Sequence, residues 1–286
     1  MLQDTKCISF VNPKGGTGKT TSCVSIGGSL AKEGKKVLIV DFDPRANATL
    51  ALGIDSSTLK KSIYDVVLSY CGYNHTPITS VILETKVPNL HIAPSEPDLA
   101  VAEVLMQNTK NKSFILKQMI SDIYNNDYIK IKAPPPNRKH LYIYDYILID
   151  LPSSAGQLMF NGLCACEHVI VPLEPGIFSL DSLDKLKNIF SDIRKMARCR
   201  IDDVTIILTR YQKPDLLSLL LRRQNASQEV EMKLKQMSGE VFIVPESQDI
   251  YEAQKQGLPV SHYAPESAVG KAYEKIADHI IINSVE

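Results

Sequence analysis

Two lysines enclose a glycine-rich segment near the start of the chain, in the sequence Lys-Gly-Gly-Thr-Gly-Lys-Thr at residues 14–20. An apolar run precedes it at 7–11 and a pattern of helical period follows it at 21–33, so the glycines connect an expected strand to an expected helix. Glycines let consecutive backbone N–H groups face one anion at the positive end of that helix. The spacing predicts a phosphate-binding loop. Its expected ligands are Gly15, Gly16, Thr17, Gly18, Lys19, Thr20 and Thr21.

Lys19 and Thr20 occupy the two positions at which such a loop contacts a nucleotide. The lysine reaches the β- and γ-phosphates, and the hydroxyl group holds Mg²⁺. The strict pattern, G-x-x-x-x-G-K-[ST], has glycine where this chain has Pro13, and it gives Lys14 no function. The sequence thus predicts a variant nucleotide site with one lysine more than the ordinary loop needs.

Acidic residues end two further apolar runs. Asp41 and Asp43 follow the run at 36–41, and Asp150 ends the run Tyr146–Asp150. Open α/β sheets bind ligands at the carboxyl ends of their strands, and a spacing of two on extended backbone directs Asp41 and Asp43 to the same side. The alternatives are a turn, which Asp, Pro and Asn favour anyway, and an Asp150 that caps the next helix. Because these acids are expected beside a phosphate loop, we favour a metal and catalytic site.

Short apolar runs rich in β-branched residues alternate with longer segments of 3.6-residue period along the whole chain. We therefore expect a single α/β domain over residues 1–286, with a mostly parallel, twisted sheet and helices on both faces. The expected strands are 7–12, 36–41, 89–93, 144–150, His168–Leu173, 204–209 and 240–244. The expected helices are 19–33, 62–70, 97–107, 112–124, 180–197, 216–236 and 266–282.

One compositional break interrupts this alternation at about residues 125–141. It contains three consecutive prolines at 134–136, which exclude a helix or a central strand. We expect an extended surface loop, with a partner-binding insertion as the alternative.

The charges of the chain balance, with 32 Lys and Arg residues against 32 Asp and Glu. Any contact with nucleic acid must therefore come from a local patch. No apolar run reaches the length of a membrane span, and the amino terminus lacks a signal-peptide core, so we expect a cytoplasmic protein without a membrane partner. The six cysteines and six histidines show no ligand spacing for a structural metal.

The segment at 14–20 resembles the deviant Walker A loop of the ParA/MinD family of ATPases. The resemblance implies a P-loop NTPase fold with ATP and Mg²⁺ as ligands, and an ATP-dependent homodimer in which Lys14 reaches the nucleotide of the partner subunit. Lys14 would then take the electrostatic role of an arginine finger, which is not otherwise evident in the sequence. The expected catalytic residues are Lys14, Lys19 and Asp43.

Residues 41–49 resemble the D-x-D-P-x-x-N-A-T segment of the same family, with Arg45 where Gln is often found. The resemblance implies that Asp43 orients the attacking water and that Asp41 supports Mg²⁺ through its water shell. Asp150 resembles the Walker B acid that completes the Mg²⁺ environment, beside Thr20. The family usually continues x-Pro-Pro after this acid, whereas this chain continues Leu-Pro-Ser.

The turns at 208–211 and 244–247 resemble segments that surround the adenine base in the family. The expected base contacts are Thr209, Arg210, Pro245 and Glu246. Many relatives have Arg where this chain has Glu246, so the details of base recognition are expected to differ.

The ParA/Soj-type partitioning ATPases are the branch that we favour. The resemblance implies an ATP dimer that binds non-specific double-stranded DNA at the nucleoid and is released when a ParB-like partner stimulates hydrolysis. Phosphate contacts need only lysine and arginine, and solvated helix faces carry the same residues. The candidates for DNA contact are Arg194, Lys195, Arg198, Arg222 and Arg223.

The alternative is a MinD-like or other cargo-positioning ATPase that acts on a membrane or a protein complex. A MinD-like protein would end in a basic amphipathic tail, whereas this sequence ends Asn-Ser-Val-Glu at 283–286. A relative that carries a metal cluster is a third class, which the cysteine spacing disfavours.

Overall fold

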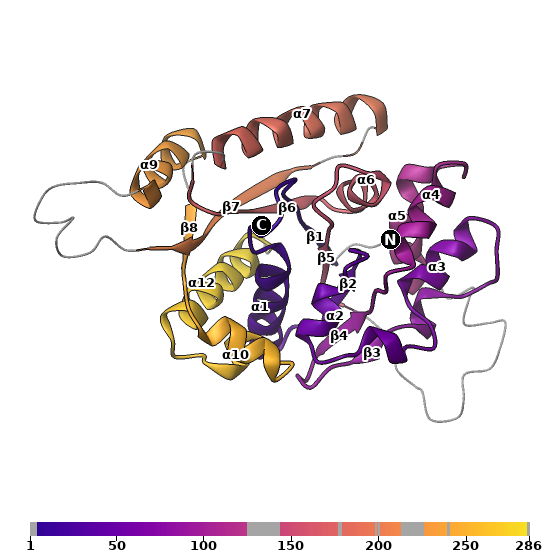
Figure 1. The fold of residues 1–286 in the computed structure, drawn as a ribbon, viewed down its shortest axis with the longest axis horizontal. Helices are drawn as coiled ribbons and strands as arrows, with labels where there is room; N and C mark the ends of the chain where they lie inside the picture. The colour runs from indigo at the N-terminus through magenta and orange to yellow at the C-terminus, as the bar shows by residue number, and fades with distance from the viewer. Residues whose placement is uncertain are drawn as a thin grey trace, which may run out of the picture.

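One sheet organises the part of the chain that the structure describes. In this computed structural model those residues are 5–124, 144–176, 179–197, 199, 201–212, 226–238 and 241–284. The strand order is β3-β4-β2-β5-β1-β6-β7-β8, and every neighbouring pair is parallel except β3 with β4 (Figure 1). The strands are β1 (Lys6–Phe10), β2 (Val37–Asp41), β3 (Leu83–Glu84), β4 (Leu90–Ala93), β5 (Tyr146–Asp150), β6 (His168–Leu173), β7 (Asp203–Tyr211) and β8 (Val241–Pro245).

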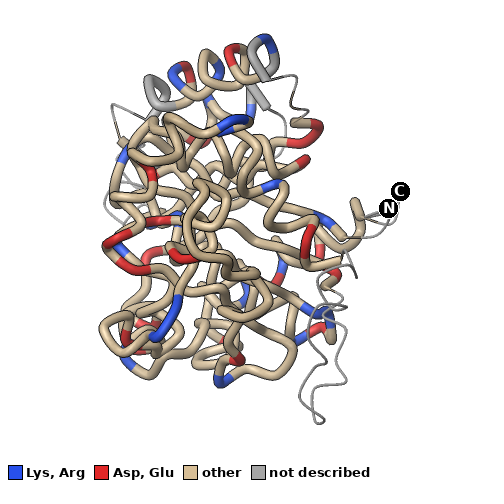
Figure 2. Tube along the Cα trace, turned by 90° about the vertical axis from the view of Figure 1, so that its right-hand side faces the viewer, with Lys and Arg blue, Asp and Glu red and all other residues tan. Residues whose placement is uncertain are grey.

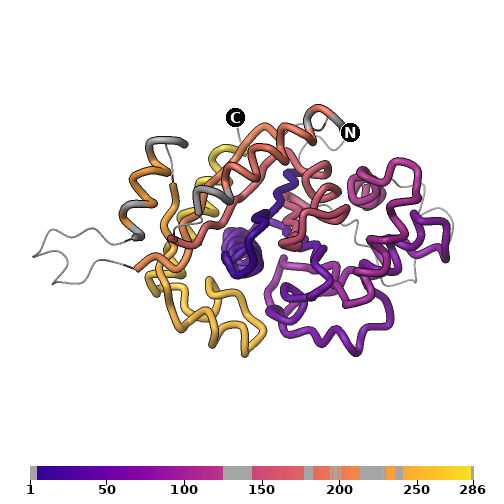
Figure 3. The backbone as a smooth tube through the Cα atoms, turned by 45° about the horizontal axis from the view of Figure 1, so that its top comes forward, coloured from indigo at the N-terminus to yellow at the C-terminus, as the bar shows by residue number. Residues whose placement is uncertain are grey.

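Helices cover both faces of this sheet, as Figures 1 and 3 show for α1 and α7 on its opposite sides. Strand β2 explains why both faces are apolar, because Leu38 and Val40 join one core and Val37 and Ile39 join the other. The helices of the first core are α3 (Ile63–Tyr70), α4 (Leu99–Met106), α5 (Ile115–Tyr124), α6 (Gln157–Cys164), α7 (Ser179–Ala197) and α9 (Ala226–Ser238). Those of the second core are α1 (Lys19–Lys32), α2 (Asn47–Ala51), α10 (Asp249–Lys255), α11 (Val260–Tyr263) and α12 (Ala268–Asn283).

The predicted class, a mostly parallel sheet with helices on both faces, is confirmed. All seven predicted strands are present, with ends that differ by no more than two residues. The prediction missed β3, because two exposed residues give no alternating pattern. It also missed the eight-residue α6, together with α2, α10 and α11, which have at most seven residues and are too short to show a clear 3.6-residue period. The helix expected at 112–124 begins as the 3₁₀ turn η3 (Lys112–Phe114).

Two predictions fall at least partly outside the described residues. The proline-rich loop at about 125–141 lies wholly outside them, and the helix expected at 216–236 is described only from Ala226 onward, as α9. The extent of the domain over residues 1–286 stays a prediction. Among the described residues, none of the helices combines the length and the hydropathy that crossing a bilayer requires.

The register of the central strands brings two acidic residues together at one edge of the sheet. Strand β5 lies between β1 and β2, and Asp150 pairs with Phe10 on one side and with Asp41 on the other. Because the three strands are parallel, their carboxyl ends meet at the same edge, where ligands bind in sheets of this class. The loop after β1 therefore lies beside the segment after β2.

His168, at the start of β6, makes the fold sensitive to acid. Its Nε2 lies 2.8 Å from Thr205 Oγ1, and burial lowers the pKa of the imidazole to about 4, against the opposing charge of Asp203. The unfolded chain binds this proton near pH 6.5 and the folded chain only near pH 4. Stability from this group is therefore fully present above pH 6.5 and falls as the pH decreases.

We expect wild-type protein to lose about 2 kcal/mol more unfolding free energy than His168→Gln between pH 7 and pH 4.5. Urea unfolding at the two pH values measures the difference. Equal losses in the two proteins would contradict the assignment to His168.

Candidate functional site

The predicted phosphate loop connects β1 to α1, and a buried side chain fixes its first residues. Gly16 and Gly18 have φ of +78° and +84°, which L side chains rarely adopt. The backbone N–H of Lys14 donates to Asn12 Oδ1 at 2.8 Å, and Asn12 Nδ2 donates to the carbonyl oxygen of Pro172 at 2.7 Å. Asn12, which is fully buried, thus ties the loop to the end of β6.

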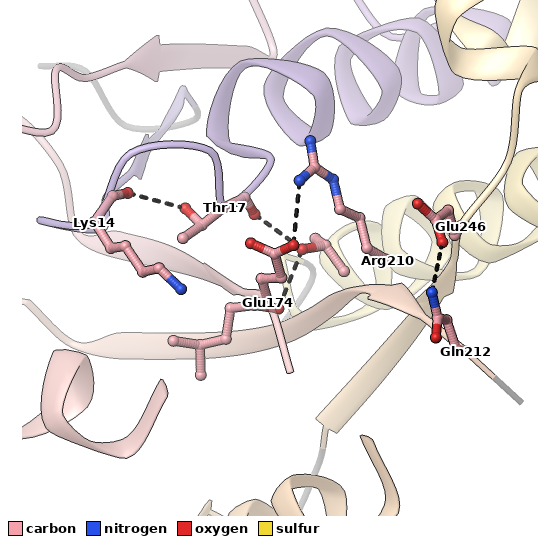
Figure 4. A network of polar contacts seen from close by, with 8 residues as sticks. Lys14, Thr17, Glu174, Arg210, Gln212 and Glu246 are labelled. Atoms are coloured by element: carbon pink, nitrogen blue, oxygen red, sulfur yellow. Dashed lines mark hydrogen bonds and ion pairs between the residues drawn. The ribbon is translucent and has the colours of Figure 1, made fainter. Parts of the chain in front are cut away.

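Thr209 holds the same loop from β7. Its Oγ1 lies 2.9 Å from the carbonyl oxygen of Thr17 and 3.1 Å from that of Leu173, so one hydroxyl group connects the loop to two strands (Figure 4). A Cβ atom on Gly18 would lie 3.3 Å from Thr209 Cγ2. Thr209 therefore packs against the loop so closely that a side chain at residue 18 would be in tight contact with it.

Gly18→Ala is expected to weaken nucleotide binding strongly and to lower the unfolding free energy by about 1 to 2 kcal/mol, because alanine is strained at positive φ. Gly34→Ala is the matched control, since Gly34 has φ of +78° but nothing within 4 Å of its added Cβ. Thermal unfolding should show similar losses for both variants. Calorimetric titration with ATP should show weakened binding only for Gly18→Ala, and equal ATP affinities would contradict the role of this contact.

Lys19 lies in the interior of the loop, with only 8% of its surface exposed. Its Nζ donates to the carbonyl oxygen of Asn12 at 3.2 Å, which leaves two N–H donors for an anion. Burial lowers the pKa of Lys19, and the nearby charges of Asp150 and Asp43 oppose this shift. A desolvated ammonium with spare donors is suited to a phosphate group.

Thr20 and Asp150 form a polar pair at the start of α1. Thr20 Oγ1 donates to Asp150 Oδ2 at 2.7 Å, whereas Asp150 Oδ1 is buried and has no hydrogen-bond partner within the described part of the chain. Burial, reinforced by Asp41, raises the pKa of Asp150 well above its usual range. Hydroxyl and carboxylate oxygens are ligands that Mg²⁺ prefers, so the unpartnered oxygen fits a cation. The described residues hold no cluster of three or more His, Cys, Asp or Glu side chains arranged for a metal, so phosphate oxygens and waters would complete such a site.

Asp41 is fully buried and organises the segment that follows β2. Its Oδ2 accepts hydrogen bonds from the backbone N–H of Thr49 at 2.8 Å and from Thr49 Oγ1 at 2.7 Å. Thr49 Oγ1 in turn accepts from the backbone N–H of Ser95, just after β4, at 3.0 Å. Burial raises the pKa of Asp41 to about 6, and the hydrogen bonds from Thr49 limit the shift. Asp41 therefore anchors both ends of the 41–49 segment.

Asp43 begins a tight turn within this segment. Strand β2 ends at Asp41, so the extended spacing expected for the two acids does not continue to Asp43. Asp43 Oδ1 accepts from the backbone N–H of Arg45 at 3.0 Å, and the Asp43 carbonyl accepts from the N–H of Ala46 at 2.9 Å. Asp43 lines the cleft described below, whereas Asp41 does not.

A cleft of about 480 Å³ opens over the loop, which is large enough for the phosphates and ribose of a nucleotide. It brings together most of the predicted phosphate ligands with Asp43. The segment after β2, the turn after β5 and helix α10 complete its walls. Its lining residues are Gly15, Gly16, Thr17, Gly18, Lys19, Thr20, Thr21, Asp43, Arg45, Asn47, Leu50, Ala51, Ser153, Arg210, Tyr251, Gln254 and Lys255.

A second cavity of about 320 Å³ adjoins the cleft and adds apolar walls from Val244 and Ile250. The two share the lining residues Gly18, Thr21, Arg210, Tyr251 and Gln254. Three predicted base contacts, Thr209, Arg210 and Glu246, line this cavity, and Pro245 lies between two of its lining residues. The prediction missed Tyr251 and Gln254, which line both cavities from α10. Gln254 Nε2 donates to Thr21 Oγ1 at 3.4 Å.

An ion pair and a hydrogen bond hold polar side chains around the second cavity. Arg210 has φ of +49°, and its Nη1 lies 3.2 Å from Glu174 Oε1. Gln212 Nε2 donates to Glu246 Oε2 at 3.0 Å. Figure 4 shows both contacts, with the Arg210–Glu174 pair next to the loop that contains Lys14 and Thr17. Glu246, the residue that departs from the resembled family, is thus engaged with Gln212.

Lys14 differs from Lys19 in its surroundings. It is half-buried and does not line the cleft formed by its own chain. Within the described residues, its Nζ makes no hydrogen bond or ion pair; only its backbone is engaged, with Asn12 and Thr17. The two lysines of the motif are therefore not equivalent.

The candidates for DNA contact are only partly described. Lys195 is exposed on α7, and Arg194 belongs to the same helix, but its side chain lies outside the description. Arg198, Arg222 and Arg223 lie outside the described residues. The described surface of α7 carries both signs of charge, including an Asp184–Lys187 ion pair of 3.4 Å (Figure 2).

Comparison with known proteins identifies close relatives in sequence. The model of the AAA-domain family matches residues 5–143 and 137–202. The chromosome-partitioning ATPase Soj of Treponema pallidum is 33% identical over 279 residues, which cover 96% of this chain and 97% of that protein. The sporulation initiation inhibitor protein Soj of Bacillus subtilis is 29% identical over 280 residues, which cover 97% of this chain and 99% of that protein.

Solved structures share the fold. McdA of Cyanothece matches with a TM-score of 0.77 at 19% identity, over 97% of this chain and 96% of that one. The septum site-determining protein MinD of Pyrococcus horikoshii matches with a TM-score of 0.68 at 26% identity, over 96% of each chain. The chain therefore belongs to the ParA/Soj-type partitioning ATPases of the ParA/MinD family, which carry the deviant Walker A loop.

Proposed function

We propose that this chain is an ATP-driven partitioning switch. It binds ATP with Mg²⁺, dimerises around the nucleotide, and binds non-specific double-stranded DNA as the dimer. A ParB-like partner then stimulates hydrolysis and releases it. The contrast between the two loop lysines carries the proposal. Lys19 is buried in the phosphate cleft, whereas the ammonium of Lys14 lies off the cleft of its own chain and has no partner among the described residues.

The donors around the cleft support ATP hydrolysis. Lys19 and the loop N–H groups bind the β- and γ-phosphates, and Asp43 orients the attacking water through the carboxylate oxygen that the Arg45 N–H does not occupy. The water oxygen bonds to the γ-phosphorus and passes a proton to the Asp43 carboxylate, the bond to the bridging oxygen breaks, and ADP leaves with that electron pair. Thr20 and Asp150 would hold Mg²⁺, with Asp41 behind them, and the ion would supply charge neutralisation at the phosphates.

The position of Lys14 supports the proposed dimerisation. A cation on the rim of one site can stabilise the nucleotide of a facing subunit, as an arginine finger does in other phosphoryl-transfer enzymes. Hydrolysis then depends on the dimer, and loss of the γ-phosphate removes the contact that holds the two subunits together.

Binding to DNA is the part of the proposal that distinguishes a DNA-partitioning ATPase from one that positions another cargo. A chain with balanced charges needs a local basic surface, and dimerisation doubles whatever surface one subunit offers. Lys195 and Arg194 on α7, together with Arg198, Arg222 and Arg223, remain the proposed contacts. Such binding would place the cytoplasmic protein at the nucleoid.

The experiment is binding of the purified full chain to duplex DNA of arbitrary sequence, with ATP, ADP or no nucleotide, across a range of salt concentrations. We expect binding only with ATP, with an affinity that falls steeply as salt increases. Lys195→Glu should weaken binding, whereas Lys271→Glu, at an exposed position on α12, should not.

Absence of DNA binding with ATP at low salt would contradict DNA as the cargo. The assignment of the protein as an ATPase would stand after that result. The alternative, a MinD-like or other positioning ATPase that acts on a membrane or a protein complex, would then be favoured.

A further inference from the structure

Four basic side chains line the phosphate cleft: Lys19, Arg45, Arg210 and Lys255. Three of them are engaged by protein groups. Lys19 donates to the loop backbone, and Arg210 pairs with Glu174 at 3.2 Å. Lys255 pairs with Glu252 at 3.4 Å and lies over the ring of Tyr251, 5.5 Å from its centre. One basic side chain of the cleft is left, and the described residues provide no partner for it.

That cation is the guanidinium of Arg45. Arg45 is exposed, and within the described residues its side chain makes neither a hydrogen bond nor an ion pair. Its positive charge acts on Lys19, whose pKa it helps to lower, so the two cations share one region of the cleft. A bound anion of several charges would attract both cations and offset the repulsion between them.

The backbone fixes the position of Arg45. The turn from Asp43 to Ala46 is closed by two hydrogen bonds to Asp43, of 3.0 and 2.9 Å. Ala46 has φ of +53°, a left-handed conformation that costs a non-glycine residue about 1 to 2 kcal/mol. Its side chain is buried, and the Asp41–Thr49 hydrogen bonds anchor the segment on either side. Such strain is retained where the surrounding structure enforces it, and it is concentrated at functional sites.

We propose that Arg45 contacts the terminal phosphate of ATP bound to its own chain and stabilises the charge that develops there during hydrolysis. A guanidinium presents paired N–H donors that match two phosphate oxygens. Arg45 thus acts within one subunit, whereas Lys14 acts across the dimer. The proposal rests on the ATPase activity and is independent of the cargo.

Arg45→Gln, compared with Arg45→Lys, tests this role. We expect Arg45→Gln to lower kcat about 100-fold, with ADP affinity little changed. The complex of ADP with aluminium fluoride, which mimics the transferred phosphoryl group, should bind about 100-fold more weakly to the same variant. Arg45→Lys should recover part of both losses, because it keeps the charge without the paired donors. Lys271→Gln, an exposed cation on α12, should match wild type.

Two results would overturn the proposal. One is an Arg45→Gln variant with wild-type kcat and thermal stability. The other is an equal loss of affinity for ADP and for ADP with aluminium fluoride, which would make Arg45 a ground-state binding residue only.

Mixing Arg45→Gln with Asp43→Ala distinguishes action within one chain from action across the dimer. If Arg45 serves its own chain, every site of a mixed dimer lacks one group and hydrolysis stays low. If Arg45 served the partner, the Arg45→Gln chain would regain an arginine from the Asp43→Ala chain. Restored hydrolysis would therefore contradict the assignment to one chain.

Discussion

Replacement of Asp43 by alanine is expected to reduce ATP hydrolysis about 1,000-fold, while ATP binding stays close to wild type. Asp43 lines the cleft beside Lys19, and among the residues that the structure describes only one of its carboxylate oxygens is engaged, by the N–H of Arg45. In the proposed mechanism the other oxygen accepts a proton from the attacking water. Phosphate release under saturating ATP measures the loss, and equilibrium titration with ATP measures binding.

Asp43→Asn is the control that separates the chemistry of Asp43 from its structural role. Asparagine retains an acceptor for the Arg45 N–H, so the turn should persist, but it loses the negative charge that orients the water. We expect Asp43→Asn to be nearly as inactive as Asp43→Ala. Wild-type phosphate release from Asp43→Asn would show that only the turn matters and would refute the catalytic role.

Lys14→Ala is expected to abolish ATP-dependent dimerisation and, with it, stimulated hydrolysis. The ammonium of Lys14 does not line its own cleft and has no partner in the described part of the chain, so its removal should cost little within one subunit. Its loss would leave the phosphates of the facing subunit without their cross-subunit cation. Sedimentation with saturating ATP measures the dimer directly.

The comparison is clearest in the slowly hydrolysing Asp43→Ala background, where nucleotide turnover does not disperse the dimer. Asp43→Ala alone should sediment as a dimer with ATP, and the double variant Lys14→Ala/Asp43→Ala should sediment as a monomer that still binds ATP. Lys19→Ala offers the contrast, since it should fail to bind ATP at all. A double variant that sediments as a dimer with ATP, as Asp43→Ala does, would contradict the cross-subunit role of Lys14.

The sequence predicts the sheet, the phosphate loop and the three acidic residues because these depend on local patterns. Apolar runs buried on both faces, a glycine-rich turn and acids at strand ends are visible without long-range contacts. The sequence did not reveal Asn12, because its role depends on Pro172, which is distant in the chain. Nor did it reveal α10, whose seven residues bury only Ala253 and show no apolar stripe.

The role of Asp41 shows a further limit of pattern reading. Its position at a strand end predicts a ligand, yet its two oxygens accept hydrogen bonds from Asp43 and Thr49. Such internal hydrogen bonds depend on the path of the chain after the strand, which spacing alone does not determine. Arg45 is similar, because only the fold shows that it lines the cleft with no side-chain partner in the part of the chain that the structure describes.

The hydrogen-bonded connection from Asp41 through Thr49 to Ser95 has a consequence for how nucleotide is recognised. It fastens the turn that carries Asp43 and Arg45 to two neighbouring strands before any ligand arrives. The conformational entropy of ordering that turn is lost during folding, so it does not subtract from the free energy of ATP binding. One chain thus presents a pre-ordered half-site, and under the proposed function the step that ATP would drive is the meeting of two such halves.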